Sequence, residues 1–160
     1  MSGCGVQMKL SEINLDSSVI ISNLTRDVHS EHVIGAISKL RSLNVKIFVS
    51  LVTYSEIWTG IELIDDATEK SRSITDLSKM LRCINARVVS DNILIARRAA
   101  KAQAEYRRRG GKREILIPDF LIGANAEFYS KRLLTTNPRD FMGYFPEVEV
   151  ITPKILIQKY

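Results

Sequence analysis

The chain has 160 residues, and its 45% apolar and 26% charged residues are typical of a globular protein that buries a core. We therefore expect a single domain over residues 1–160, with a loose N-terminus at residues 1–10 and an apolar C-terminal tail at residues 154–160. No apolar run reaches the roughly 18 residues needed to cross a bilayer, which argues against a membrane protein.

Residues 1–5 lack the basic and apolar regions of a signal peptide. The cysteines Cys4 and Cys83 have the spacing of neither a metal site nor a disulfide framework, so we expect reduced thiols and a cytoplasmic protein. The formal net charge of +5 mildly favours a polyanionic partner.

Strand and helix patterns alternate along the chain. Short runs rich in β-branched residues predict strands at residues 12–16, 45–49, 133–136 and 148–151, and a strand or extended link at 86–89. Apolar residues spaced three and four apart predict helices at residues 19–24, 30–43, 51–64, 74–84, 91–109 and 119–130. Such alternation is typical of an α/β layer fold with a mainly parallel sheet.

Local features add detail to this prediction. The polar residues 65–73 predict a loop or a solvated helical turn. Pro118 disfavours a helical backbone at Ile117, so we expect residues 115–117 to be extended. Gly60 is unfavourable inside a helix, which suggests that another backbone comes close there. The helix that begins at Asp119 is apolar on nearly all sides and is expected at the centre of the molecule.

Four acidic residues occur in comparable settings. Asp16 follows the first strand, Glu56 lies in the second turn of the helix after the second strand, and Asp119 begins the most apolar helix. Asp140 follows the predicted strand at residues 133–136. The carboxyl ends of parallel strands meet at one edge of a sheet, where ligands bind, so we expect the four carboxylates to converge there.

Each acid also has an ordinary structural interpretation. Asp16 and Asp119 are plausible N-caps of the helices that they precede. Glu56 has apolar neighbours in its helix and could form a lone buried salt bridge. Asp140 could be a turn residue or pair with Arg139. The four acids together are better evidence for a site than any one of them alone.

Four carboxylates in one place would repel each other, and a hard divalent cation such as Mg²⁺ would relieve that repulsion. A metal held in this way can generate hydroxide and stabilise charge on a phosphoryl oxygen. His29 and His32 lack a zinc-ligand spacing and are expected to be ordinary surface residues.

Four motifs, in order, resemble those of a known family. They are Asp-Ser-Ser-Val-Ile at 16–20, Ser-Leu-Val-Thr-Tyr-Ser-Glu at 50–56 with Gly60, Pro-Asp-Phe-Leu-Ile-Gly-Ala at 118–124, and Thr-Thr-Asn-Pro-Arg-Asp-Phe at 135–141. The chain resembles PIN-domain nucleases, most closely the VapC-type toxins of toxin–antitoxin pairs. It departs from their pattern at Ser18, where asparagine is commoner, and at Pro138, which stiffens the last motif.

The resemblance implies a three-layer α/β/α fold around a twisted, mainly parallel sheet of four to five strands. It also implies an endoribonuclease that depends on Mg²⁺ or Mn²⁺ and hydrolyses RNA phosphodiester bonds. Asp16 and Asp119 would be the main metal ligands. Glu56 would orient or deprotonate the attacking water or hold a second metal, and Asp140 would help to bind that metal directly or through water.

Further residues and partners follow from the same resemblance. Ser18, Thr135 and Asn137 would hydrogen-bond to carboxylates, water or the substrate phosphate. The family commonly forms homodimers, and an antitoxin peptide that lies near the acidic site inhibits the toxin. The resemblance therefore implies a cognate antitoxin and a homodimer.

Cationic residues crowd into one stretch after residue 96. The basic patch, as we call it, consists of Arg107, Arg108, Arg109, Lys112 and Arg113. A patch of this kind suits the RNA backbone without base readout, and it could equally contact an acidic partner. Its ordinary interpretation is a solvated helix face and a basic loop.

Three alternatives remain open at this point. The first is a PIN nuclease that acts in RNA processing without an antitoxin. The second is a catalytically inactive PIN module that binds RNA or protein. The third is an unrelated phosphatase with Asp16 as its nucleophile, but such enzymes usually place a second aspartate two residues later, where Ser18 stands.

Overall fold

Five parallel strands form a single sheet in the order β3-β2-β1-β4-β5. The computed structural model describes residues 9–112 and 117–160. The strands are β1 (Glu12–Leu15), β2 (Lys46–Ser50), β3 (Arg87–Val89), β4 (Arg132–Leu134) and β5 (Glu149–Ile151). The predicted parallel sheet of four to five strands is thereby confirmed. Most of the loose N-terminus expected at residues 1–10 lies outside the described residues.

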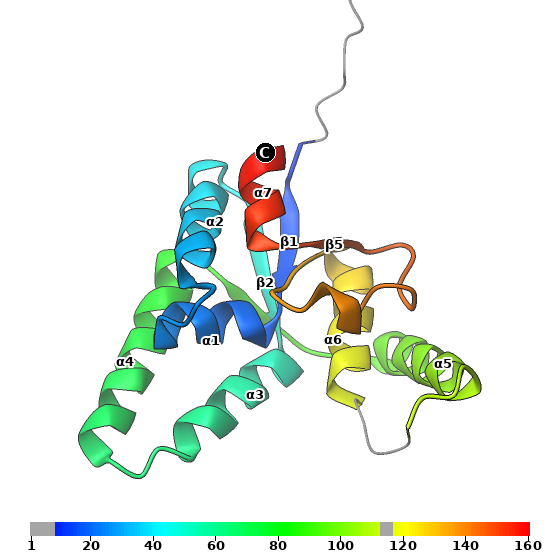
Figure 1. Cartoon of the computed structure of the whole chain (residues 1–160), viewed down its shortest axis with the longest axis horizontal. Helices are drawn as coiled ribbons and strands as arrows, with labels where there is room; N and C mark the ends of the chain where they lie inside the picture. Colours follow the sequence, from blue (N-terminus) through cyan, green and yellow to red (C-terminus); the bar gives the residue numbers. More distant parts are fainter. Residues whose placement is uncertain (1–8, 113–116) are drawn as a thin grey trace, which may run out of the picture.

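Helices cover both faces of the sheet and give the predicted three-layer α/β/α arrangement (Figure 1). One face carries α1 (Ser17–Thr25), α2 (Ser30–Ser42), α4 (Ala67–Cys83) and α7 (Pro153–Lys159). The opposite face carries α5 (Ile93–Arg108) and α6 (Ile117–Tyr129). The helix α3 (Leu51–Glu62) follows β2 and contacts α1, α4 and α6. No helix within the described residues is long and apolar enough to cross a membrane.

The alternation of side chains along β1 distributes its residues between the two faces. Ile13 and Leu15 belong to the core on the α1, α2 and α4 side. Asn14 points the other way, and its Nδ2 donates to Oδ1 of the buried Asn125 in α6 at 2.9 Å. Ser130 donates to Asn14 Oδ1 at 2.8 Å, so this buried amide has hydrogen-bond partners and fixes α6 against the central strand.

The polar residues 65–73 differ from the prediction of a loop or a single helical turn. They belong almost entirely to α4, one helix of 17 residues whose N-cap, Asp66, accepts a hydrogen bond from Glu69 N at 2.7 Å. Only a few of their side chains are partly buried, so they form a solvated face of that helix. The apolar spacing marked only the part of α4 that reaches the core.

The extended conformation expected before Pro118 is wrong at Ile117, which is the first residue of α6. Proline is tolerated in the first turn of a helix, where its missing N–H would have no helical partner, and this outweighs the local preference of the preceding residue. Residues 115 and 116 lie outside the described part of the chain.

Gly60 also differs from the expectation. A Cβ built on Gly60 would meet no atom of the described residues within 4 Å, so no backbone packs there. Close approaches occur instead at Gly123, where a Cβ would lie 2.3 Å from the Phe145 ring, and at Gly35, where it would lie 2.9 Å from Ile157 of α7. The apolar tail at residues 154–160 thus docks on α2 as a helix, with Leu156 buried.

Candidate active site

Asp16 directly follows the central strand β1 and is only 5% exposed. It occupies the N-cap position of α1, yet its side chain makes no capping hydrogen bond. Its Oδ2 accepts instead from Ser18 Oγ at 2.7 Å and from Thr135 Oγ1 at 2.8 Å. The interpretation of Asp16 as an ordinary helix cap is therefore wrong, because the carboxylate is held by two hydroxyl groups.

The same hydroxyl groups connect the loops that follow β1 and β4. Thr136 N donates to Ser18 Oγ at 3.1 Å, and Asn137 N donates to Thr135 Oγ1 at 3.0 Å. The side chain of Asn137 is exposed and forms no hydrogen bond with another residue that the structure describes. Ser18 and Thr135 thus lie beside a carboxylate as the motifs predict, whereas Asn137 joins the network only through its backbone.

Glu56 lies in the second turn of α3, whose N-cap is Ser50. The Ser50 side chain caps this helix by accepting from Thr53 N at 3.0 Å. Burial raises the pKa of the Glu56 carboxyl group, a hydrogen-bonding contribution from Ser17 lowers it, and the negative charge of Asp16 raises it further. The Oε2 atom is buried and has no hydrogen-bond partner among the described residues.

Asp119 is the third residue of α6 and therefore lies inside the first helical turn rather than at the N-cap. Burial, followed by the charges of Asp16, Asp140 and Glu56, raises the pKa of its carboxyl group from 3.8 to about 7. The other three predicted acids all contribute to this shift, so Asp119 lies within electrostatic reach of each of them.

Asp140 ends a short 3₁₀ turn, Pro138–Asp140, that follows β4. Partial burial of its carboxyl group raises the pKa, and the charge of Asp16 raises it further. Within residues 9–112 and 117–160, no lysine or arginine forms an ion pair with this or the other three acids. The salt-bridge interpretations considered for Glu56 and Asp140 are therefore wrong for the described part of the chain.

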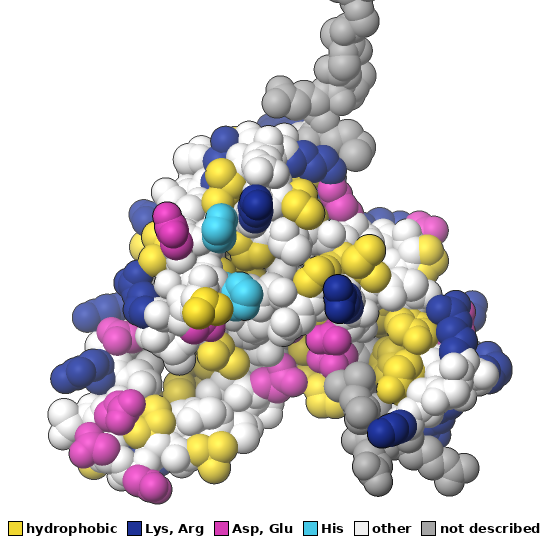
Figure 2. Space-filling view, viewed as in Figure 1, with side chains coloured by type: hydrophobic (Ala, Val, Ile, Leu, Met, Phe, Trp, Pro, Cys, Tyr) yellow, Lys and Arg dark blue, Asp and Glu magenta, His cyan; other side chains and the backbone are white. Residues whose placement is uncertain are grey.

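The four carboxylates come from four segments and lie at the carboxyl edge of the sheet, close enough to shift each other's pKa values. Figure 2 shows acidic side chains near the centre of the view as well as at the lower left, and basic side chains over α5 at the right. No three His, Cys, Asp or Glu side chains of the described residues are close enough together to hold a metal ion. Oxygen donors of this kind, one of them buried and unpaired, are nevertheless what a hard divalent cation requires.

The basic patch lies at the C-terminal end of α5 and just beyond it. Arg107, Arg108 and Lys112 are exposed, while Arg113 lies outside the described residues. Arg109 pairs with Glu105 and also lies over the Tyr144 ring, with its Cζ 5.1 Å from the ring centroid. The structure therefore leaves Arg107, Arg108 and Lys112 available for an anionic ligand.

The sequence did not predict the roles of two residues in this region, Ser17 and Arg98. Ser17 influences the Glu56 carboxyl group, and its place in the motif beside Asp16 was a signal that could have indicated this role. Arg98 turns inward and pairs with Glu127 of α6, with its Nε 2.9 Å from Glu127 Oε1. The two residues are 29 positions apart, and no spacing rule links them.

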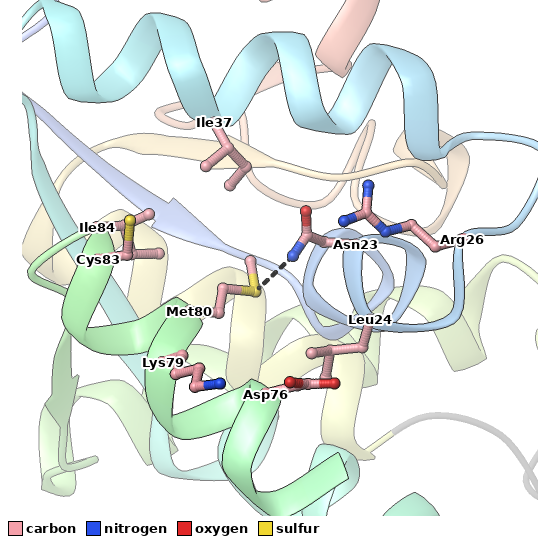
Figure 3. A pocket seen from close by; sticks show the side chains of 9 residues that line it. All are labelled: Asn23, Leu24, Arg26, Ile37, Asp76, Lys79, Met80, Cys83 and Ile84. Carbon is pink, nitrogen blue, oxygen red and sulfur yellow. Dashed lines mark hydrogen bonds between the residues drawn. The ribbon is translucent and has the colours of Figure 1, made fainter. Parts of the chain in front are cut away.

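A cavity of about 380 Å³ between α1, α2 and α4 lies apart from the predicted site (Figure 3). Its polar and charged lining residues include Asn23, Arg26, Asp76 and Lys79, and Asn23 Nδ2 lies 3.2 Å from the Met80 sulfur. None of the predicted site residues lines it, so this cavity gives no support to the catalytic interpretation.

A family model described as the PIN domain matches residues 13–144, which contain all four acids. No curated protein sequence matches the chain. The match therefore covers most of the molecule, from the central strand β1 to the segment that follows Asp140.

Solved structures share this fold at low sequence identity. VapBC2 from Rickettsia felis, bound to a DNA fragment from its promoter, has a TM-score of 0.72 at 16% identity over 88% of this chain and 98% of that chain. FitAcB from Neisseria gonorrhoeae has a TM-score of 0.71 at 23% identity, with 89% and 98% covered. VapBC-5 from Mycobacterium tuberculosis, a member of the VapBC family of toxin–antitoxin systems, has a TM-score of 0.60 at 18% identity, with 89% and 98% covered.

Proposed function

Because the chain belongs to the PIN-domain family, we propose that it is a metal-dependent endoribonuclease and the toxin of a toxin–antitoxin pair. The observation that supports this most strongly is the gathering of Asp16, Glu56, Asp119 and Asp140 at one edge of the sheet without a cationic side chain paired to any of them among the described residues. A bound divalent cation would relieve the repulsion between these carboxylates.

Asp16 and Asp119 would hold a divalent ion, Mg²⁺ or Mn²⁺, with Asp140 contributing directly or through water. When bound, such an ion lowers the pKa of water and stabilises charge on a phosphoryl oxygen. Ser18 and Thr135 would orient the Asp16 carboxylate by donating to its Oδ2. Glu56, with a raised pKa and a free buried oxygen, would orient the attacking water or accept its proton.

The basic patch would bind the RNA backbone through Arg107, Arg108 and Lys112. Cationic side chains at the end of a helix give sequence-independent affinity for phosphates. The similar solved structures named above include a member of the VapBC family of toxin–antitoxin systems, and this supports a cognate antitoxin for the present chain. We also propose, from the family resemblance, that the chain forms a homodimer.

Incubation of the pure protein with structured and single-stranded RNAs, in Mg²⁺ or in EDTA, tests the proposed activity. We expect internal cleavage in Mg²⁺ only, and no cleavage by Asp16→Asn or Asp119→Asn. The exposed aspartate Asp76 of α4 offers a matched control, and Asp76→Asn should cleave like the wild-type protein. Binding of RNA without cleavage under all of these conditions would favour the catalytically inactive PIN module.

Two further measurements test the proposed partners. Co-expression with the product of the adjacent gene should yield a stable complex with reduced nuclease activity if an antitoxin exists. An active nuclease that no neighbouring product binds would favour the RNA-processing alternative. Light scattering of the purified chain should give the mass of a dimer, and a monomeric mass would reject the proposed homodimer.

A further inference from the structure

The segment that carries Asp140 has no regular secondary structure beyond its short 3₁₀ turn. We call residues 138–145 the Asp140 segment. It packs against α5 and α6 through Phe141 and Phe145, which are 1% and 2% exposed and belong to the core on that side of the sheet. The position of the Asp140 carboxylate therefore depends on how this segment is held against the two helices.

Arg98 of α5 connects the three parts of this region. Its Nε donates to Glu127 Oε1 of α6 at 2.9 Å, and its Nη2 donates to the Tyr144 carbonyl oxygen at 2.7 Å. Its Cζ lies 4.7 Å from the centroid of the Phe145 ring. The planar guanidinium group can make these contacts at once, whereas a lysine ammonium group has no such fixed geometry.

We infer that Arg98 is a positioning residue that sets the Asp140 carboxylate relative to Asp119. Asp119 and Glu127 belong to the same helix, so Arg98 fixes the Asp140 segment to the element that carries Asp119. This inference rests on the proposed function, in which Asp140 and Asp119 bind the same cation.

Movement at Tyr144 would reach Asp140 through a short hydrogen-bonded path. Tyr144 N donates to the Phe141 carbonyl oxygen at 3.5 Å, and Phe141 N donates to the Pro138 carbonyl oxygen at 3.2 Å. Pro138 and Asp140 belong to the same 3₁₀ turn. The Phe145 ring also lies so close to Gly123 that a Cβ there would be 2.3 Å away. The Asp140 segment consequently has little freedom to shift while the contacts of Arg98 are intact.

The Arg98–Glu127 pair is not arranged for maximal stability. The second carboxylate oxygen, Glu127 Oε2, is buried and has no hydrogen-bond partner in the described part of the chain. The two side chains are 24% and 20% exposed, and ion pairs removed from water often contribute little net stability because desolvation opposes their attraction. A role in fixing geometry explains this arrangement better than a role in stability alone.

Manganese binding in the absence of RNA, measured by titration with electron paramagnetic resonance, tests the inference without relying on activity. Arg98→Gln should bind Mn²⁺ about 10–100-fold more weakly than the wild-type protein, as for other residues that orient metal ligands. Arg98→Lys should show a smaller loss. RNA affinity in EDTA should be the same for all of these proteins, because the contacts of Arg98 are with Glu127 and the Asp140 segment and not with the substrate.

Arg132, at the amino end of β4, supplies a matched control. Its Nε lies 3.2 Å from Glu149 Oε2, and the side chains are 18% and 30% exposed, so Arg132→Gln removes a similar ion pair that holds neither α6 nor the Asp140 segment. If Arg98→Gln weakens Mn²⁺ binding no more than Arg132→Gln does, the inference is overturned. Weaker RNA binding in EDTA by Arg98→Gln would also overturn it, since Arg98 would then contact the substrate.

If Arg98→Gln does not fold, Arg98→Lys tests the positioning role instead. A folded Arg98→Lys protein with wild-type Mn²⁺ affinity would refute the positioning role, and a weakened affinity would support it. Failure of the wild-type protein to bind Mn²⁺ would instead reject the proposed function itself. The two failures are therefore distinguishable in a single set of titrations.

Discussion

Ionisation of Asp119 should make the metal-free protein less stable as the pH rises. Burial and three neighbouring carboxylates raise the pKa of this group from 3.8 to about 7. Between these two values the folded state retains a proton that the unfolded state releases. The free energy of unfolding must therefore decrease as the pH rises through this window.

The size of the effect follows from the two pKa values. At about 1.4 kcal/mol per pKa unit, the difference between 3.8 and about 7 sets an upper bound of roughly 4 kcal/mol on the destabilisation of the fully ionised group, and solvent screening reduces the effect because the side chain is only partly buried. Between about pH 5 and pH 8, Asp119 alone would account for at most roughly 2.5 kcal/mol, because part of the difference already applies at the lower pH.

Urea unfolding in EDTA at these two pH values measures the effect. Asp119→Asn replaces the ionisable group with a neutral one of the same shape, so it should lose much less stability than the wild-type protein between the two pH values. Some dependence will remain, since the pKa values of Glu56 and Asp140 are also raised. Asp76→Asn, on the exposed side of α4, should behave like the wild-type protein. An unchanged pH dependence in Asp119→Asn would refute the electrostatic account of the site.

Four further results are expected. Mg²⁺ should stabilise the wild-type protein more at high pH than at low pH in the same urea experiment, because a cation binds the ionised carboxylates; equal stabilisation would contradict this. Thr135→Val should reduce cleavage about 10–100-fold, because it removes a hydrogen bond to Asp16, whereas Thr75→Val in α4 should not reduce it. Gly123→Ala should destabilise the protein by about 1–3 kcal/mol through its clash with Phe145, and an unaltered urea midpoint would show that the ring moves freely. Changing three residues of the basic patch to alanine should weaken RNA binding and flatten its dependence on salt; these residues are Arg107, Arg108 and Arg109. The control changes three exposed arginines elsewhere, Arg72, Arg82 and Arg87, to alanine and should leave both properties unchanged.

The sheet and the four acids could be predicted because local sequence determines them. Short β-branched runs predicted four of the five strands and left β3 open as a strand or an extended link, and each acid was identified by its place after a strand or in the first turns of a helix. Ser18 and Thr135 were found through the motifs, and both donate to Asp16. These features depend on residues that are close together in the chain or on the general topology of parallel sheets.

Other features depend on contacts that local sequence does not reveal. The polar first half of α4 reads as a loop because most of its residues are exposed, and only its capping aspartate, Asp66, marks the true beginning of the helix. Gly60 was expected at a close approach, yet Gly123 and Gly35 are the glycines that closely approach residues of distant segments, Phe145 and Ile157. The pairing of Arg98 with Glu127 and the Tyr144 carbonyl joins residues 29 and 46 positions apart, and only tertiary structure brings them together.

The four carboxylates are not equivalent, and the order of the strands explains why. The charge of Asp16 contributes to the raised pKa values of Glu56, Asp119 and Asp140, whereas Asp140 is a cause of the shift only at Asp119. Asp16 follows β1, the central strand, and the segments that follow its two neighbours, β2 and β4, supply Glu56 and Asp140 from either side. A residue at the end of the central strand is the one that can approach both flanking segments and α6 at once. The hydroxyl groups of Ser18 and Thr135 hold the carboxylate at that position, so the distances from Asp16 to the other three acids depend on how this one side chain is held.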